Sequence, residues 1–320
     1  MQKFNQLFLA FLPIATFITC TSTAKQRPEG GWLWKISGNG LSHPSYLFGT
    51  YHGTYDILYQ YTDSIPELHQ AFNACSQFAG ESETTSKPTP AQVGAAIKLP
   101  KDTTYADLLN KEDFHFLDSI VRQSLKSPLN KMYIKPNFLA LILGEIEKGK
   151  KLVDTGYSQS RIDSMKSQVM DIALEKKAKE KGLTIVGLED IFDAFVSEKS
   201  NLKKEADELI SDLREDDEIS PLSFVNTLSD VYRTQNMKSL IDFEVKVDSI
   251  FRTSPKLTEI GKRIREDLLK RRNLNWMNKI PELMKAQPTF IAVGVRHLPG
   301  KDGLIALLLE KGYQVEPIGL

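Results

Sequence analysis

Cysteine is scarce in this sequence, with only Cys20 and Cys75 among 320 residues. Two cysteines can form at most one disulfide, so a small framework held together by several disulfides is excluded. Cys20 lies where the first apolar run of the chain meets a soluble tract. If Cys20 is removed with an export signal or carries a lipid, Cys75 has no partner and is a free thiol.

An excess of charge of one sign is also absent, because 41 basic residues balance 41 acidic residues. This balance gives no electrostatic reason to expect nucleic acid or anionic lipid as a partner. Charge is concentrated only in residues 203–220 (KKEADELISDLREDDEIS), a pattern typical of a solvated helix and its loop. The sequence therefore predicts no binding to nucleic acid.

Long hydrophobic runs are missing apart from residues 7–18 (LFLAFLPIATFI), which follow Lys3. This run is too short to span a bilayer with ease, and Pro13 interrupts it. We therefore predict an export signal over residues 1–24 and a protein of the periplasm, the cell surface or the medium. Cys20 is placed like the lipidated cysteine of a bacterial lipoprotein. Plain secretion and attachment to a membrane through a lipid on Cys20 both stay open.

Short apolar segments rich in β-forming residues are present in the rest of the chain, at residues 45–48, 77–79, 183–187, 289–294 and 313–318. The first four run directly into a glycine or end on one, and polar or charged residues follow, as buried strands do when they leave a sheet. A strand that follows a helix and a glycine is typical of a crossover between parallel strands. The sequence predicts a single α/β domain over residues 31–320, with a mostly parallel central sheet flanked by helices.

Helical spacing of apolar residues occupies the stretches between these segments. Residues 163–181 carry Met165, Val169, Ile172 and Ala173 on one face, and Gly182 stands where a helix C-cap belongs. Residues of about 104–150 and about 221–286 have helical spacing and no strong strand pattern. We expect these two stretches to be helical insertions that cover the sheet or form a lid.

Four of the predicted strands deliver a residue that can bind a metal ion or transfer a proton: His52, Glu81, Glu189 and His297. In open parallel sheets, ligands bind outside the carboxyl ends of the strands, so these side chains are expected at one crevice. Both histidines follow a glycine by three residues, in GTYH and GVRH. Glycine lets the backbone turn sharply and approach a ligand closely.

Two imidazoles and one carboxylate form a familiar catalytic zinc set, with a further position for water. Manganese, cobalt or iron would suit the same donors, so the sequence predicts a divalent metal ion of open identity. The second carboxylate would act as a general base or orient a histidine. Glu83 follows Glu81 on the same side of an extended chain and stays an alternative to it.

Two further groups of residues complete this prediction. Arg272 lies on a long helical pattern before the strand that leads to His297, where it is either a helix-surface residue or a cation that steadies a developing oxyanion. The other histidines have no comparable context, and we expect them at the surface: His43, His69 and His115.

Several blocks in a fixed order resemble those of the TraB/GumN family, which is similar in turn to the Tiki metalloproteases. The blocks are GWLWKISGNG at 31–40, SYLFGTYHG at 45–53, KPNFLALIL at 135–143, MDIALEKKAKEKGLTIVGLED at 170–190, RRNLNWMNKIPELM at 271–284 and TFIAVGVRHLPGKDGLIALLLEKGYQVEPI at 289–318. The resemblance implies an α/β fold with His52, Glu81 and His297 as metal ligands at the active centre. It also implies functional roles for Glu189 and Arg272.

The resemblance implies a metal-dependent hydrolase of the bacterial cell envelope, foremost a peptidase, acting on a peptide or another small hydrolysable substrate. More distant relatives resemble erythromycin esterases and a haem-binding lipoprotein. Two alternatives therefore stay open: a metal-free hydrolase of esters or lactones, and a protein that binds haem or metal without catalysis. This sequence departs from the family pattern at Ser82 and Glu83, which keeps the choice between Glu81 and Glu83 open.

Overall fold

The computed structural model of the chain describes residues 30–51, 66–83, 89–154, 156, 158, 170–190, 201–214 and 228–319. The predicted export signal over residues 1–24, with Cys20, lies outside the described residues, and so does His52. Within the described ranges, no helix is long and apolar enough to cross a membrane.

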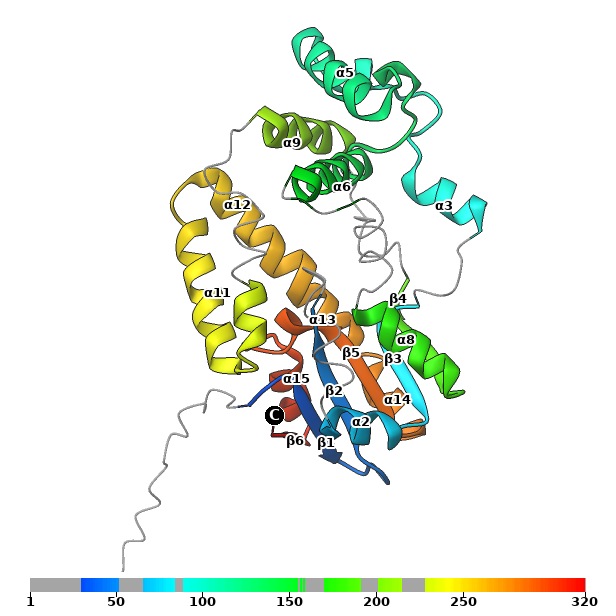
Figure 1. Cartoon of the computed structure of the whole chain (residues 1–320), viewed down its shortest axis with the longest axis vertical. Coiled ribbons are helices and arrows are strands. Elements are labelled where there is room, and N and C mark those ends of the chain that lie inside the picture. The colour runs from blue at the N-terminus through cyan, green and yellow to red at the C-terminus, as the bar shows by residue number, and fades with distance from the viewer. Residues whose placement is uncertain are drawn as a thin grey trace, which may run out of the picture.

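One mixed sheet forms the centre of the described structure (Figure 1). Its strands are β1 (Leu33–Gly38), β2 (Ser45–Thr50), β3 (Gln77–Ser82), β4 (Thr184–Glu189), β5 (Thr289–Gly294) and β6 (Tyr313–Pro317). The spatial order is β4-β3-β5-β2-β1-β6. The strands β4, β3, β5 and β2 run parallel to one another, while β1 is antiparallel to both β2 and β6. The α/β prediction with a mostly parallel sheet is confirmed.

Strand β1 has no counterpart among the predicted strands. It forms a hairpin with β2 through a turn in which Gly38, Asn39 and Gly40 all have positive φ angles. The sequence Asn-Gly between two apolar segments is a strong hairpin signal, so this turn could have revealed the strand. The hairpin places β1 between β2 and β6, on the side of β2 that faces away from β5.

Helix α8 (Met170–Glu180) packs on the parallel strands and leads into β4. Gly182 follows it with a φ of 72°, as expected for a glycine that ends a helix. Of the predicted apolar face, Ala173 packs against the main core, whereas Ile172 is 37% exposed. Met165 and Val169 lie outside the described residues. Met170, Leu174 and Ala178 are buried, since positions four residues apart in a helix form one stripe and this stripe faces the sheet.

Aromatic rings form the centre of the main core. Phe290 on β5 is fully buried, and its ring centroid lies 6.1 Å from that of Phe48, 5.0 Å from that of Phe72 and 6.3 Å from that of Phe78. Phe72 belongs to helix α2 (Pro66–Asn73), so this cluster joins a helix to three neighbouring strands. Rings at these separations pack closely and add to the stabilisation by burial.

A group of helices forms a second hydrophobic core away from the sheet, at the upper end in Figure 1. Its members include α4 (Tyr105–Leu108), α5 (Lys111–Leu125), α6 (Pro136–Asp154) and α9 (Leu202–Arg214), with the 3₁₀ turn η2 (Leu129–Lys131). Helix α3 (Pro90–Ile97) precedes them. Leu117 and Leu139 are fully buried at the centre of this second core.

The second long helical stretch connects the upper helices to the sheet. It comprises α11 (Met237–Phe251), α12 (Pro255–Arg263), the π-helical segment η3 (Ile264–Lys270), α13 (Arg271–Trp276) and α14 (Ile280–Ala286). After β5 follow a 3₁₀ turn, η4 (Val295–His297), and α15 (Leu304–Glu310). Arg263 of α12 forms an ion pair with Glu208 of α9 at 3.1 Å, which links the two parts.

The remaining described histidines and Cys75 differ in exposure. His43, His69 and His115 are exposed, as predicted. Cys75 is a buried free thiol, and burial raises its pKa to about 12. A thiol with so high a pKa is almost entirely protonated near neutral pH, so Cys75 is a poor nucleophile and a poor metal ligand.

Candidate active site

The carboxyl ends of three parallel strands bring three predicted residues together. Glu81 lies near the end of β3, Glu189 ends β4, and His297 ends η4, directly after β5. Arg272 of α13 reaches the same edge and contacts all three side chains. The structure thus brings Glu81, Glu189 and His297 together as predicted, while His52, the fourth residue of that prediction, lies outside the described residues.

The end of β2, which leads toward His52, lies at the same edge. Thr50 is paired with Gly294, so the glycines of the two Gly-x-x-His segments stand on adjacent strands. Tyr232 donates its hydroxyl to the carbonyl oxygen of Gly49 at 2.7 Å, and Thr50 donates to Asp171 Oδ1 at 2.9 Å. These contacts fix the chain at the point where β2 ends.

Arg272 forms the centre of the cluster. Its Nη2 donates to Glu81 Oε2 and to Glu189 Oε1, both at 2.5 Å, and its Nε donates to Glu189 Oε1 at 2.9 Å. Its side chain is only 13% exposed, so it is not a helix-surface residue. Burial lowers the pKa of Arg272, but the contacts with Glu189 and Glu81 raise it by more, so the pKa lies above its usual value. The guanidinium therefore stays charged at any physiological pH.

The hydrogen bonds of Asn273 determine the protonation of His297. Asn273 Nδ2 donates to the backbone oxygens of His297 at 3.2 Å and Asp302 at 2.8 Å, which fixes the amide orientation. Asn273 Oδ1 then faces His297 Nδ1 at 2.7 Å and must accept a proton from it. His297 Nε2 lies 3.2 Å from Arg272 Nη1, which can only donate. His297 is thus neutral, with the lone pair of Nε2 directed into the cluster.

Trp276 is a residue of this site that the sequence interpretation missed. Its indole nitrogen donates to Glu189 Oε2 at 3.1 Å, and its ring lies 4.5 Å from that of His297. The guanidinium of Arg272 lies 4.7 Å from the same ring. Residues four apart on a helix share one face, so the spacing of Arg272 and Trp276 was the available signal. The interpretation also expected Glu189 as a possible orienting partner of a histidine, but Asn273 orients His297 and Glu189 contacts Arg272 and Trp276.

The helix that carries these residues is widened just before them. The seven residues of η3 are π-helical and run directly into α13. A π-helical segment shifts the direction of all later side chains relative to a continuous α-helix, and such segments are frequent at functional sites. The sequence gave no sign of η3. None of its described side chains is buried, so the segment leaves no apolar pattern that could reveal it.

The glycines of the two Gly-x-x-His segments permit close approach within the protein. A Cβ atom on Gly49 would lie 2.8 Å from Val295 Cγ2, so this glycine lets the two segments pack together. Gly294 donates its backbone N–H to Glu81 Oε1 at 2.7 Å. The φ of Gly294 is −51°, so no left-handed conformation requires glycine there. The backbone N–H of Gly294 orients the Glu81 carboxylate.

Gly294→Ala is expected to destabilise the protein by about 1–3 kcal/mol, because a methyl group must displace neighbouring atoms in a well-packed site. The new Cβ would lie 3.2 Å from Glu81 Oε1 and would loosen its hydrogen bond. Urea unfolding measures the change. Gly144→Ala on α6 is the matched control, since nothing lies within 4 Å of its Cβ position. Equal stability of Gly294→Ala and the wild type would contradict this account.

Two of the predicted metal ligands, Glu81 and His297, lie close together in the cluster. Glu81 Oε1 lies 3.8 Å from His297 Nε2. Two ligands of one tetrahedral zinc ion are roughly 3.4 Å apart, which follows from bond lengths of about 2.1 Å. His52, the third candidate ligand, is outside the described residues, and the described residues contain no group of three metal-binding side chains. Arg272 donates hydrogen bonds to both Glu81 and His297, the two side chains that would bind the ion.

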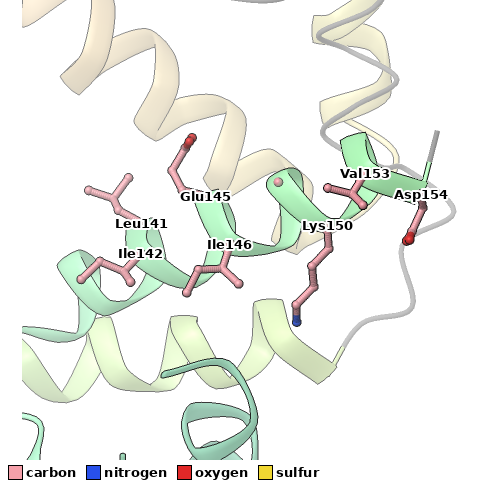
Figure 2. Close-up of a pocket in the computed structure, with 8 residues that line it drawn as sticks. Leu141, Ile142, Glu145, Ile146, Lys150, Val153 and Asp154 are labelled. Carbon is pink, nitrogen blue, oxygen red and sulfur yellow. The ribbon is translucent and has the colours of Figure 1, made fainter. Parts of the chain in front are cut away.

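A groove of about 670 Å³ lies along α6 and is distinct from this cluster (Figure 2). Its described lining residues are Leu141, Ile142, Glu145, Ile146, Gly149, Lys150, Val153 and Asp154. All of them belong to α6, and none belongs to the cluster around Arg272. The groove is largely apolar and gives no information about the chemistry at the strand ends.

Comparison with known proteins gives one match. The model of the TraB/PrgY/gumN family matches residues 32–317, a range that contains every strand of the sheet and the whole cluster around Arg272. No curated protein and no solved structure matches the chain. The resemblance inferred from the sequence blocks is confirmed over nearly the whole chain, and the protein belongs to the TraB/PrgY/gumN family.

Proposed function

We propose that the protein is a metal-dependent hydrolase of the bacterial cell envelope, with a peptide as its substrate. The observation that carries this proposal is the neutral imidazole of His297, whose Nε2 lone pair points toward Glu81 and Arg272. Neutral imidazole and carboxylate are the donors that catalytic metal sites use. The export signal predicted from the sequence over residues 1–24 motivates the proposed location in the envelope.

In this proposal Glu81, His297 and His52 hold a divalent ion, which is zinc, manganese, cobalt or iron. Such an ion polarises a carbonyl group and lowers the pKa of water, which is the chemistry that hydrolysis requires. Asn273 keeps the Nε2 lone pair of His297 available, and the N–H of Gly294 orients the Glu81 carboxylate. Partners of this kind tune the affinity of metal ligands.

Glu189 and Arg272 act beside the ion. Glu189 accepts hydrogen bonds from both Arg272 and Trp276, and these contacts suit an anchor better than a mobile base. The anchored guanidinium of Arg272 carries a fixed positive charge close to the reacting carbonyl. A preorganised donor at this place stabilises the negative charge that develops on the carbonyl oxygen during hydrolysis.

A second candidate function is hydrolysis of an ester or lactone without a metal ion. The hydrogen bond between His297 Nδ1 and Asn273 Oδ1 favours it, because a neutral, oriented imidazole is also a suitable base for water. Arg272, 3.2 Å from Nε2, would then bind the developing oxyanion directly.

Elemental analysis and chelation test the proposal on the purified protein. We expect about one equivalent of a transition metal, loss of peptide hydrolysis after chelation, and recovery when the metal is restored. Glu81→Gln is expected to lower metal affinity at least about ten-fold, while Glu83→Gln serves as the matched control. Hydrolysis that survives chelation would reject the metal-dependent reaction and favour the second candidate. Full metal content in Glu81→Gln would reject Glu81 as a ligand.

A further inference from the structure

We propose that Arg272 is a built-in competitor of the metal ion. Its guanidinium takes up the Nε2 lone pair of His297 that an ion would use and pairs with the carboxylate of Glu81, and Glu189 retains the guanidinium when an ion enters. This inference rests on the proposed function, in that the same residues are taken to bind the ion. It adds a role for Arg272 before any substrate is present.

The contacts of Arg272 make the guanidinium and an ion mutually exclusive at His297 Nε2. Arg272 Nη2 donates to Glu81 Oε2 at 2.5 Å, and Nη1 donates to His297 Nε2 at 3.2 Å. A neutral imidazole whose other nitrogen carries the proton has one lone pair, so Nε2 cannot serve the guanidinium and an ion together. An ion that uses Nε2 must therefore displace Arg272 Nη1.

Glu189 and Trp276 hold the guanidinium independently of the atoms that an ion would take. Glu189 accepts from Arg272 Nε at 2.9 and 3.2 Å and from Nη2 at 2.5 Å. The Trp276 ring lies 4.7 Å from the guanidinium, and its indole nitrogen fixes Glu189 Oε2 at 3.1 Å. Arg272 can thus lose its contacts with Glu81 and His297 while these contacts remain.

The charges at the cluster explain why a competitor is needed. The side chains of Glu81 and Glu189 are only 15% and 11% exposed. Two carboxylates so close together and so little hydrated are costly without a cation between them. The guanidinium supplies that cation in the protein without metal, so the site can fold before an ion binds. Once an ion neutralises Glu81, the Nη groups of Arg272 become available for a substrate oxygen.

Calorimetric titration of the metal-free protein with Mn²⁺ and Zn²⁺ tests the inference. Arg272→Lys keeps the positive charge but lacks the fork that reaches both carboxylates and the imidazole. We expect this variant to bind the ion on the order of ten-fold more tightly than the wild type, because charge-assisted contacts no longer compete. Arg271→Lys is the matched control, since Arg271 is 45% exposed and lies 3.9 Å from Asp267.

The role of Glu189 is tested by a double-mutant cycle. Glu189→Gln is expected to weaken ion binding when Arg272 is present. A guanidinium that has lost the Glu189 carboxylate pairs more strongly with Glu81 and therefore competes better with the ion. The same change is expected to have little effect in Arg272→Lys. Circular dichroism and the unfolding midpoint of each variant establish that it is folded.

The outcomes separate this inference from the proposed function. An affinity of Arg272→Lys equal to or weaker than that of the wild type would overturn the competitor role while leaving the metal site intact. Equal effects of Glu189→Gln in both backgrounds would also overturn it, because Glu189 would then act on the ion directly. If neither the wild type nor any Arg272 variant bound an ion, the proposed function itself would fail.

Discussion

His297→Gln is expected to lose metal binding and about 10²- to 10⁴-fold in turnover while the protein stays folded. The imidazole is 4% exposed, packs against Trp276 and presents Nε2 to Glu81 and Arg272. Glutamine fills a similar volume but cannot place a nitrogen lone pair at the same point. Steady-state hydrolysis, elemental analysis and the unfolding midpoint measure the three parts of this result.

The control for this change is His115→Gln on α5. His115 is exposed and belongs to the group of helices that has its own core. This variant is expected to keep full metal content and activity. Unchanged turnover in His297→Gln would refute a catalytic or metal-binding role for His297. Loss of turnover with metal content retained would instead favour the metal-free reaction with His297 as the base.

Phe290→Ala is expected to destabilise the protein by about 3–5 kcal/mol, the usual cost of removing a large aromatic side chain from a core. The ring of Phe290 lies between those of Phe48, Phe72 and Phe78, so its removal leaves a cavity that neighbouring strands cannot close. Strand β5 also leads to His297. Activity should therefore fall even at temperatures at which the Phe290→Ala variant is still folded. Guanidinium unfolding followed by circular dichroism gives the change in free energy.

Tyr133→Ala is a suitable comparison for Phe290→Ala, because Tyr133 is 64% exposed. Removal of an exposed aromatic side chain is expected to change stability by no more than about 0.5 kcal/mol. A similar small change for Phe290→Ala would show that the aromatic cluster does not determine the stability of the sheet.

Local patterns were enough to predict much of the parallel part of the fold. Apolar segments that end in glycine located β2, β3, β4 and β5. A strand buried on both faces, such as β5, is apolar along its whole length. The edge strand β4 shows the same pattern although it is only partly buried. The same patterns placed Ile172 on the apolar face of α8, although it is exposed and the buried stripe runs through Met170, Leu174 and Ala178. They also missed β1, although the residues Gly38-Asn39-Gly40 are a recognisable signal for the turn that follows it.

The sequence by itself determined the α/β fold and the strand ends that deliver Glu81, Glu189 and His297, since strand periodicity and turns are local properties of the chain. Only the tertiary structure decided how these side chains meet. Arg272 contacts Glu81 across 191 residues of sequence and Glu189 across 83, and Gly294 reaches Glu81 across 213. The burial of Arg272, the protonation of His297 and the part played by Trp276 follow from such contacts. Periodicity does not encode them, because they depend on how elements far apart in the chain pack against one another.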